Sequence, residues 1–146
     1  MRYFEDVDVG ETGTFGAETL TKADIVAFAE QWDPQRFHAD EEAAAKSVHG
    51  GLIASGLHTI GVAMYHWVEG WLDDVANLGA RYIREIRFEE PVRPGDTLGI
   101  RGEVLEKTVP DHTDGHGYLD YELAAYVDGE PVMTMVTDLV VERHGE

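Results

Sequence analysis

Residues 50–72 read GGLIASGLHTIGVAMYHWVEGWL, and the spacing of their apolar side chains dictates the architecture. Apolar residues recur at steps of three and four, as they do on one face of a helix, and small or apolar residues also fill positions in between. Ser55 is suited to cap this helix, because its side chain can accept a hydrogen bond from a backbone N–H of the first turn. The pattern predicts a helix over residues 57–72 that is buried over most of its circumference.

Four extended segments follow this helix. Runs rich in Val, Ile, Tyr and Thr predict strands over residues 80–90, 97–108, 117–128 and 131–142. Arg-Pro-Gly-Asp at 93–96 and Val-Asp-Gly-Glu at 127–130 are turn sequences, and Asp-Gly between two alternating runs favours a hairpin. A buried helix followed by an antiparallel meander requires a sheet wrapped around that helix, which is an α+β architecture.

The segments before residue 50 are shorter. Residues 12–20 predict a first strand, and Ile, Phe, Ala and Trp at helical spacing predict a helix over residues 22–32. Thr21 and Asp24 are placed to cap its start, and Pro34 to end it. Acidic residues at the start of 40–47 predict a second, short helix.

The length and composition fit one hydrophobic core. The chain has 146 residues, of which 43% are hydrophobic, with no repeat, linker or low-complexity tract, so we expect a single domain over 1–146. No apolar run approaches the roughly 20 residues that span a membrane, and the first residues lack a secretory h-region. The absence of cysteine excludes disulfides, thiolate nucleophiles and Cys-based zinc sites. We therefore expect a cytoplasmic protein.

The charge is strongly negative. Asp and Glu number 29 against 11 Lys and Arg, which gives a formal net charge of −18. Such a field repels nucleic acid and anionic membrane surfaces, so we expect neither as a partner. Salt screens self-repulsion of this size, and the composition favours a salt-loving source organism, the alternative being an acidic mesophilic protein.

Asp33 and His38 are the candidate acid–base pair. They lie five residues apart across a proline-stiffened loop between two helices, and imidazole can accept or donate a proton near neutral pH. The spacing alone also fits structural roles, with Asp33 as a cap and His38 hydrogen-bonded at a helix start.

Gly51, Ser55 and Gly56 form the candidate binding segment. The helix capped by Ser55 has free N–H groups in its first turn, and these donors and the helix dipole favour developing negative charge. Glycine at 56 lets a ligand approach the backbone closely. A tightly packed helix start without a ligand is the alternative.

Other candidates are weaker. Residues 112–116, His-Thr-Asp-Gly-His, have the ligand types of a metal site, but their composition favours a solvated hairpin loop, so we expect no metal. His58 and His66 are expected at the edge of the core, and His49 in a turn or on the site. The tryptophans are expected in packing or subunit contacts: Trp32, Trp67 and Trp71.

Together these motifs resemble the MaoC-like dehydratases, a family that includes the (R)-specific enoyl-CoA hydratases. Asp33 and His38 match the family's acid–base pair, and Gly56 matches the glycine whose N–H holds the thioester carbonyl. Residues 50–59 and 88–98 also resemble segments of one branch of the family. The chain departs from the family pattern in two places, with Arg36-Phe37 in place of Asn-Pro and Ser55 where many hydratases have His. The resemblance therefore implies the acid–base pair but not a simple fatty enoyl-CoA as the substrate.

The resemblance implies a hot-dog fold, commonly paired as a homodimer, and an enzyme of fatty acid metabolism. It implies hydration of a 2-enoyl-CoA, or the reverse dehydration: Asp33 and His38 hold one water, one group accepts its proton, and the other delivers a proton to the α-carbon. No cofactor is expected beyond the CoA thioester substrate. Two alternatives stay open, a non-catalytic acyl-CoA-binding protein and a thioesterase, for which this chain offers only Glu69 and Asp73 as helix carboxylates.

Overall fold

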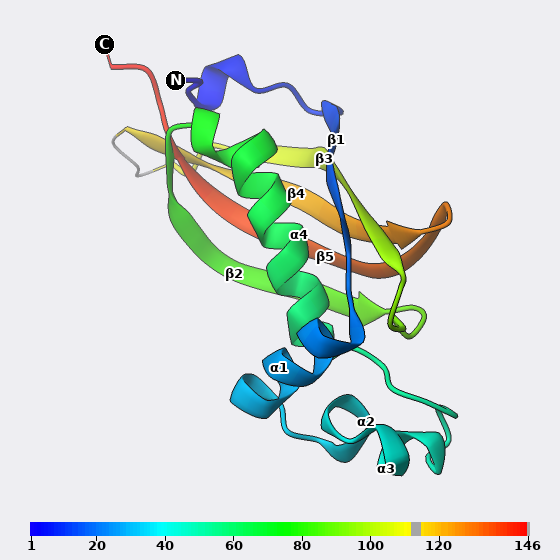
Figure 1. Cartoon of the computed structure of the whole chain (residues 1–146). Coiled ribbons are helices and arrows are strands. Elements are labelled where there is room, and N and C mark those ends of the chain that lie inside the picture. The colour runs from blue at the N-terminus through cyan, green and yellow to red at the C-terminus, as the bar shows by residue number, and fades with distance from the viewer. Residues whose placement is uncertain (112–114, 146) are drawn as a thin grey trace.

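The strands form one antiparallel sheet that curves around a long helix (Figure 1). The computed structural model describes residues 1–111 and 115–145. The sheet has the order β1-β3-β4-β5-β2. Its strands are β1 (Thr12–Thr19), β2 (Asn77–Phe88), β3 (Thr97–Thr108), β4 (His116–Val127) and β5 (Glu130–Glu142). Helix α4 (Gly56–Gly70) lies in the hollow of the sheet, as expected for a hot-dog fold.

Helix α4 begins where the sequence predicts, because the Ser55 Oγ accepts a hydrogen bond from the Leu57 N–H at 3.2 Å. Its buried side chains are Thr59, Val62, Ala63 and Trp67. As predicted, most of its circumference is buried or half-buried, and the exposed residues lie mainly on one stripe, in which Leu57 and Tyr65 are 55% and 60% exposed. The sheet covers one face of the helix, and the spacing of apolar residues does not distinguish a face that meets the core from one left open.

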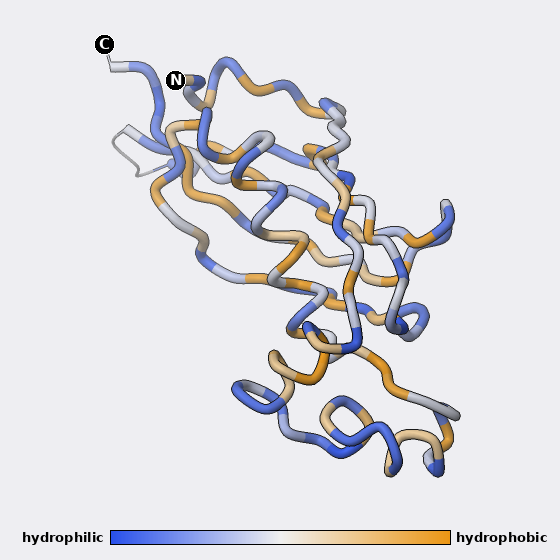
Figure 2. Tube along the Cα trace, in the orientation of Figure 1, coloured by the Kyte–Doolittle hydropathy of each residue, from blue (hydrophilic) through white to orange (hydrophobic). Residues whose placement is uncertain are grey.

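The core lies between α4 and the middle of the sheet. Alternate residues of β4 and β5 point at the helix, as the period of two along a strand requires. The rings of Trp67 and Trp71 pack against Tyr121 with centroids 4.7 and 4.6 Å apart. Figure 2 shows hydrophobic residues concentrated along the strands, while hydrophilic residues are frequent around α2 and α3. Trp67 and Trp71 pack as expected, whereas Trp32 is 65% exposed.

The turns between strands follow the sequence prediction. Asp128 and Gly129 both have positive φ, 50° and 81°, which a two-residue type I′ hairpin turn requires. At the other turn the Asp96 N–H donates to the Arg93 carbonyl at 3.0 Å. Strand β2 starts three residues earlier than predicted and ends at Phe88, two residues before the predicted end.

Short helices at one end of α4 position the loop that carries Asp33 and His38 (Figure 1). Helix α1 (Lys22–Trp32) has the predicted Thr21–Asp24 capping box. Helix α3 (Glu41–Ala45) is shorter than the predicted 40–47 and is capped by Asp40. Helix α2 (Arg36–Ala39) was not predicted, because four residues are too few to show a periodic pattern. The remaining helical turns are η1 (Phe4–Asp6) and η2 (Leu72–Asp74).

Two sequence expectations concern features that the structure addresses only in part. No helix within the described residues is long and apolar enough to cross a membrane. Residues 112–114 of the His-Thr-Asp-Gly-His segment lie outside the described residues, so the hairpin-loop interpretation stays a prediction. Elsewhere in the described ranges, no three His, Asp or Glu side chains gather as metal ligands would.

Candidate active site

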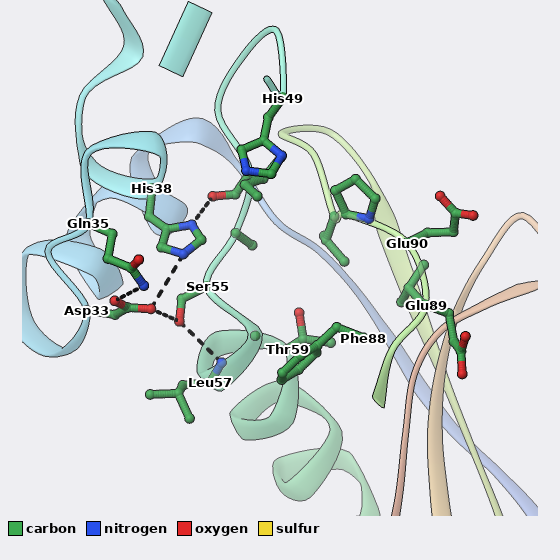
Figure 3. Close-up of a pocket in the computed structure, with 16 residues that line it drawn as sticks. Asp33, Gln35, His38, His49, Ser55, Leu57, Thr59, Phe88, Glu89 and Glu90 are labelled. Carbon is green, nitrogen blue, oxygen red and sulfur yellow. Dashed lines mark hydrogen bonds and ion pairs between the residues drawn. The ribbon is translucent and has the colours of Figure 1, made fainter. Parts of the chain in front are cut away.

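A cavity of about 500 Å³ opens between the start of α4, the α2 segment and the end of β2 (Figure 3). Most of the surface that its wall exposes is apolar, which suits a small organic ligand. The apolar lining residues are Ile53, Ala54, Leu57, Phe88, Pro91, Val92 and Val132. The polar ones are Asp33, Gln35, His38, His49, Ser55, Thr59, Glu89 and Glu90.

His38 is fixed by a reciprocal pair of hydrogen bonds between α2 and the segment before α4. Its Nδ1 lies 2.8 Å from the Ile53 carbonyl oxygen, and the Ile53 N–H donates to the Phe37 carbonyl at 3.1 Å. A carbonyl only accepts, so Nδ1 must carry a hydrogen. In the neutral ring Nε2 is then an acceptor, and it points at Asp33 (Figure 3).

Asp33, at the end of α1, is held by two neutral donors. The Gln35 Nε2 donates to its Oδ1 at 2.9 Å, and the Ser55 Oγ donates to its Oδ2 at 2.7 Å. These hydrogen bonds lower the pKa of the Asp33 carboxyl, so it is ionised at neutral pH. The His38 Nε2 lies 3.5 Å from Oδ2, so with a neutral imidazole two acceptors face one another beside the cavity.

Ser55 and Gly56 connect this pair to α4. The Ser55 hydroxyl donates to Asp33 while it accepts from the Leu57 N–H, so one side chain sets both the carboxylate and the helix start. Within the described residues the Gly56 N–H has no hydrogen-bond acceptor, and it belongs to the positive end of a 15-residue helix. A Cβ at Gly56 would collide with the Phe88 ring, so this position admits no side chain without rearrangement.

The structure therefore brings four of the five predicted site residues together: Asp33, His38, Ser55 and Gly56. Gly51 is not among the described residues that line the cavity. It lies beside the guanidinium of Arg93, which itself donates to the His49 carbonyl at 2.6 Å. His49 is on the cavity wall, and His58 and His66 are half-buried as expected.

The sequence did not identify several residues of the wall, among them Gln35, Thr59 and Phe88. Gln35 had a usable signal, since an amide two residues after Asp33 is close enough to reach its carboxylate. Thr59 also had one, because a polar residue three positions after Gly56 shares its helix face. Phe88 had none, because only the curvature and register of the sheet bring the end of β2 to the start of α4.

The curved sheet around one helix, with a carboxylate and an imidazole at the head of that helix, defines a hot-dog protein with an acid–base pocket. A family model described as "MaoC like domain" matches residues 8–124. The chain belongs to this MaoC-like family, as its motifs predicted.

Proteins of known name agree with this membership. The chain is 36% identical over 107 residues to a 3-hydroxybutyryl-CoA dehydratase of Methylorubrum extorquens. The matched region covers 71% of this chain and 64% of that protein. The chain is 31% identical over 114 residues to an (R)-specific enoyl-CoA hydratase of Rhodospirillum rubrum, with coverage of 73% and 75%. Both names describe hydro-lyases, the class of enzyme expected from the sequence.

Among solved structures, a MaoC-like dehydratase from Rhodospirillum rubrum superimposes with a TM-score of 0.86. Its sequence identity is 32%, and the match covers 99% of each chain. The hot-dog fold expected from the sequence is therefore confirmed.

Proposed function

We propose that this protein adds water to the double bond of a 2-enoyl-CoA thioester, or removes it in the reverse direction, with Asp33 and His38 as the acid–base pair. One observation carries the proposal: the Asp33 Oδ2 and the His38 Nε2, both acceptors, lie 3.5 Å apart beside an apolar cavity and a free backbone N–H. Relatives named for this chemistry support it.

The two acceptors are suited to hold one water. A water molecule that donates one hydrogen to Asp33 and the other to His38 presents its oxygen lone pairs to the cavity. As that oxygen bonds to the β-carbon, one hydrogen passes to the Asp33–His38 pair. The pair returns one proton to the α-carbon, so the elements of water are added and the pair is restored.

In this proposal the Gly56 N–H donates a hydrogen bond to the oxygen on which negative charge develops. Attack at the β-carbon moves electrons through the α-carbon onto the thioester oxygen, which becomes enolate-like. A donor that is already in place, at the positive end of α4, stabilises that oxygen without reorganisation. No metal or redox cofactor is included in the proposal, because the thioester itself makes the α-position acidic.

The direct test is the absorbance of the conjugated thioester. Crotonyl-CoA and a panel of short, branched and dicarboxylic enoyl-CoAs are incubated with the protein in high salt, and loss of the enoyl band reports hydration. Asp33→Asn and His38→Gln proteins that keep both their fold and the wild-type rate would refute the assignment. An Asp33→Asn protein that retains acyl-CoA affinity, beside a wild type without turnover, would instead indicate the non-catalytic binder.

The thioesterase alternative finds less support in the geometry. The two carboxylates that the chain offers for this role, Glu69 and Asp73, are exposed and do not line the cavity. Release of free CoA, measured with a thiol reagent in the same incubation, would support the thioesterase instead.

We also propose that the protein forms a homodimer through β2. β2 is the end strand of the sheet, and an uncovered edge is a template for pairing with another chain. It also exposes five large apolar side chains: Leu78, Tyr82, Ile83, Ile86 and Phe88. Light scattering should give twice the chain mass, and Ile83→Lys should reduce it to one chain, whereas Val109→Lys, also at an exposed apolar residue, should not.

We further propose that the protein comes from a salt-loving organism and is located in the cytoplasm. Both inferences rest on the net charge of −18 and on the composition of the chain. The salt dependence of stability, given in the Discussion, tests the first.

A further inference from the structure

Thr59 is a buried polar residue of α4 that no part of the mechanism above uses. Its exposed fraction is 2%, and its hydroxyl points into the cavity (Figure 3). Throughout the described part of the chain, no hydrogen bond to this hydroxyl is formed. This hydroxyl oxygen is accessible from the cavity and is not sealed in the core, so its natural partner is a group that occupies the cavity.

The helix itself does not supply that partner. A threonine in a helix often donates to the carbonyl four residues earlier, which here belongs to Ser55. That carbonyl already accepts the N–H groups of His58 at 3.0 Å and of Thr59 at 3.2 Å. Two acceptor sites serve two donors, and the Thr59 hydroxyl remains free.

The position of Thr59 directs its hydroxyl toward Gly56. Residues three and four apart on a helix lie on one face, so Thr59 shares a face with Gly56 and Ser55. Helical side chains tilt toward the N-terminus of their helix and lie over the preceding turn. The Thr59 hydroxyl therefore points back toward the free N–H of Gly56.

The other donors around the catalytic pair are already engaged. Gln35 and Ser55 both donate to Asp33, and the Nδ1–H of His38 donates to Ile53. On the α4 side of the cavity, among the described residues, two donors remain: the Gly56 N–H and the Thr59 O–H.

We propose that the Thr59 hydroxyl is a second hydrogen-bond donor to the thioester oxygen, acting beside the Gly56 N–H, and so is a catalytic residue. This inference rests on the proposed function and deepens it. The hydroxyl keeps its proton throughout: it donates to the oxygen as negative charge develops there and relaxes when the α-carbon is protonated. Every enoyl-CoA carries this oxygen, so Thr59 acts on all of them alike, whatever the acyl group.

Kinetics with isosteric variants give the first test. Thr59→Val removes the hydroxyl and keeps the shape, and should lower kcat about 10²–10³-fold, the usual loss for one such donor. Thr59→Ser keeps the hydroxyl and should retain most of the rate. Thr108→Val, a matched change at an exposed position on β3, should change nothing. Should the valine protein fail to fold, Thr59→Ala replaces it with the same expectation.

The acyl dependence separates this role from substrate selection. A similar loss with crotonyl-CoA and with an enoyl-CoA that carries a polar group supports the proposal. A loss confined to the polar substrate overturns it, because Thr59 would then bind the acyl group rather than the thioester.

An infrared measurement tests the contact without turnover. Butyryl-CoA labelled with ¹³C at the thioester carbonyl is saturated and cannot be hydrated, and a hydrogen bond to its oxygen lowers the carbonyl stretching frequency. The frequency should be lower in the wild type and in Thr59→Ser than in Thr59→Val. Equal frequencies in all three, or no bound carbonyl band in the wild type, would overturn the inference. A wild type that shows this difference yet hydrates no enoyl-CoA would refute the proposed function alone.

Discussion

The protein holds buried or half-buried carboxylates in two places, and they are held differently. Asp33 lies at the cavity and is fixed by Gln35 and Ser55, which are neutral. Asp120 and Asp138 are paired across β4 and β5, on the sheet face turned away from α4. There Arg81 donates twice to Asp138, at 2.7 and 3.1 Å, and Arg84 donates to Asp120 at 2.8 Å.

The difference lies in what remains available on each carboxylate. Arg81 occupies both oxygens of Asp138, and the second oxygen of Asp120 is buried without access to a cavity. At Asp33, neutral donors keep the group ionised while one oxygen still faces His38 and the cavity. A reacting carboxylate is therefore marked by an oxygen that a ligand can reach, and neither burial nor charge alone identifies it.

The two Asp-to-Asn changes at these places should separate function from structure most strongly. Asp33→Asn should reduce hydration of crotonyl-CoA about 10²–10⁴-fold, the usual contribution of a positioned acid or base, because the amide cannot take a proton. Asp120→Asn, the matched control on the other face of the sheet, should leave kcat unchanged. Equal losses of activity in the two variants would mean that the cavity-facing oxygen of Asp33 gives it no functional difference from Asp120.

Within the second place, the two aspartates should differ in stability. Although burial opposes ionisation, the hydrogen bonds from Arg81 lower the pKa of Asp138. Asp138→Asn should therefore lower the free energy of unfolding at pH 7 by about 1–2 kcal/mol, a value kept small because Arg81 is 41% exposed. Urea unfolding measures the change, and an unaltered midpoint would contradict the structural role of the pair.

Asp120→Asn should have the opposite sign. Burial and the neighbouring Asp138 raise the pKa of Asp120 in the folded protein. The protonated form therefore stabilises the fold, and this contribution is lost as the pH rises from the pKa of Asp120 in the unfolded chain through its pKa in the folded protein. Asparagine mimics the protonated form at every pH. The variant should thus match the wild type in acid and equal or exceed its stability at pH 7, as urea midpoints at the two pH values would show.

A smaller effect is expected from the donor that holds Asp33. Gln35→Met removes the hydrogen bond to Oδ1, so the pKa of Asp33 should rise toward its ordinary value. Because the pair accepts hydrogens from water only when Asp33 is ionised, the acid limb of kcat/KM should move to higher pH, with the rate at neutral pH changed less than about tenfold. An unmoved acid limb would show that this limb reports another group.

Salt should produce the smallest and most general change. The Debye length falls from about 10 Å at 0.1 M to about 3 Å at 1 M, so added KCl should raise the Tm of a chain of charge −18. The destabilisation by Asp138→Asn should persist at 1 M, because that carboxylate is 5% exposed and shielded from ions. A Tm that falls with KCl would contradict the salt-loving origin.

The sequence predicts the segments whose structure is decided locally. The Asp128–Gly129 turn, the bounds of β3 and the caps at Thr21 and Ser55 all follow from neighbouring residues. The closeness of Asp33 and His38 is of the same kind, since the short loop after Asp33 leaves His38 within reach.

Features that depend on distant partners were not predictable in this way. The bulges of β2, with Glu85 at φ 53°, follow from pairing with β5, and they set where Phe88 falls. The contact of Phe88 with Gly56, and the difference between the buried and open faces of α4, also require the assembled sheet. Gly51 shows the converse, because its place in a glycine-rich motif suggested a site that the fold does not give it.

Strand β2 borders the sheet along its length and ends in the ring that rests on Gly56. A second chain that pairs along β2 contacts the same strand whose last residue, Phe88, lines the cavity. If pairing of a second chain along β2 shifts Phe88, that pairing and ligand binding in the cavity are coupled, and by linkage each then changes the affinity of the other by the same factor. The ligand concentration that half-fills the cavity would then depend on the protein concentration.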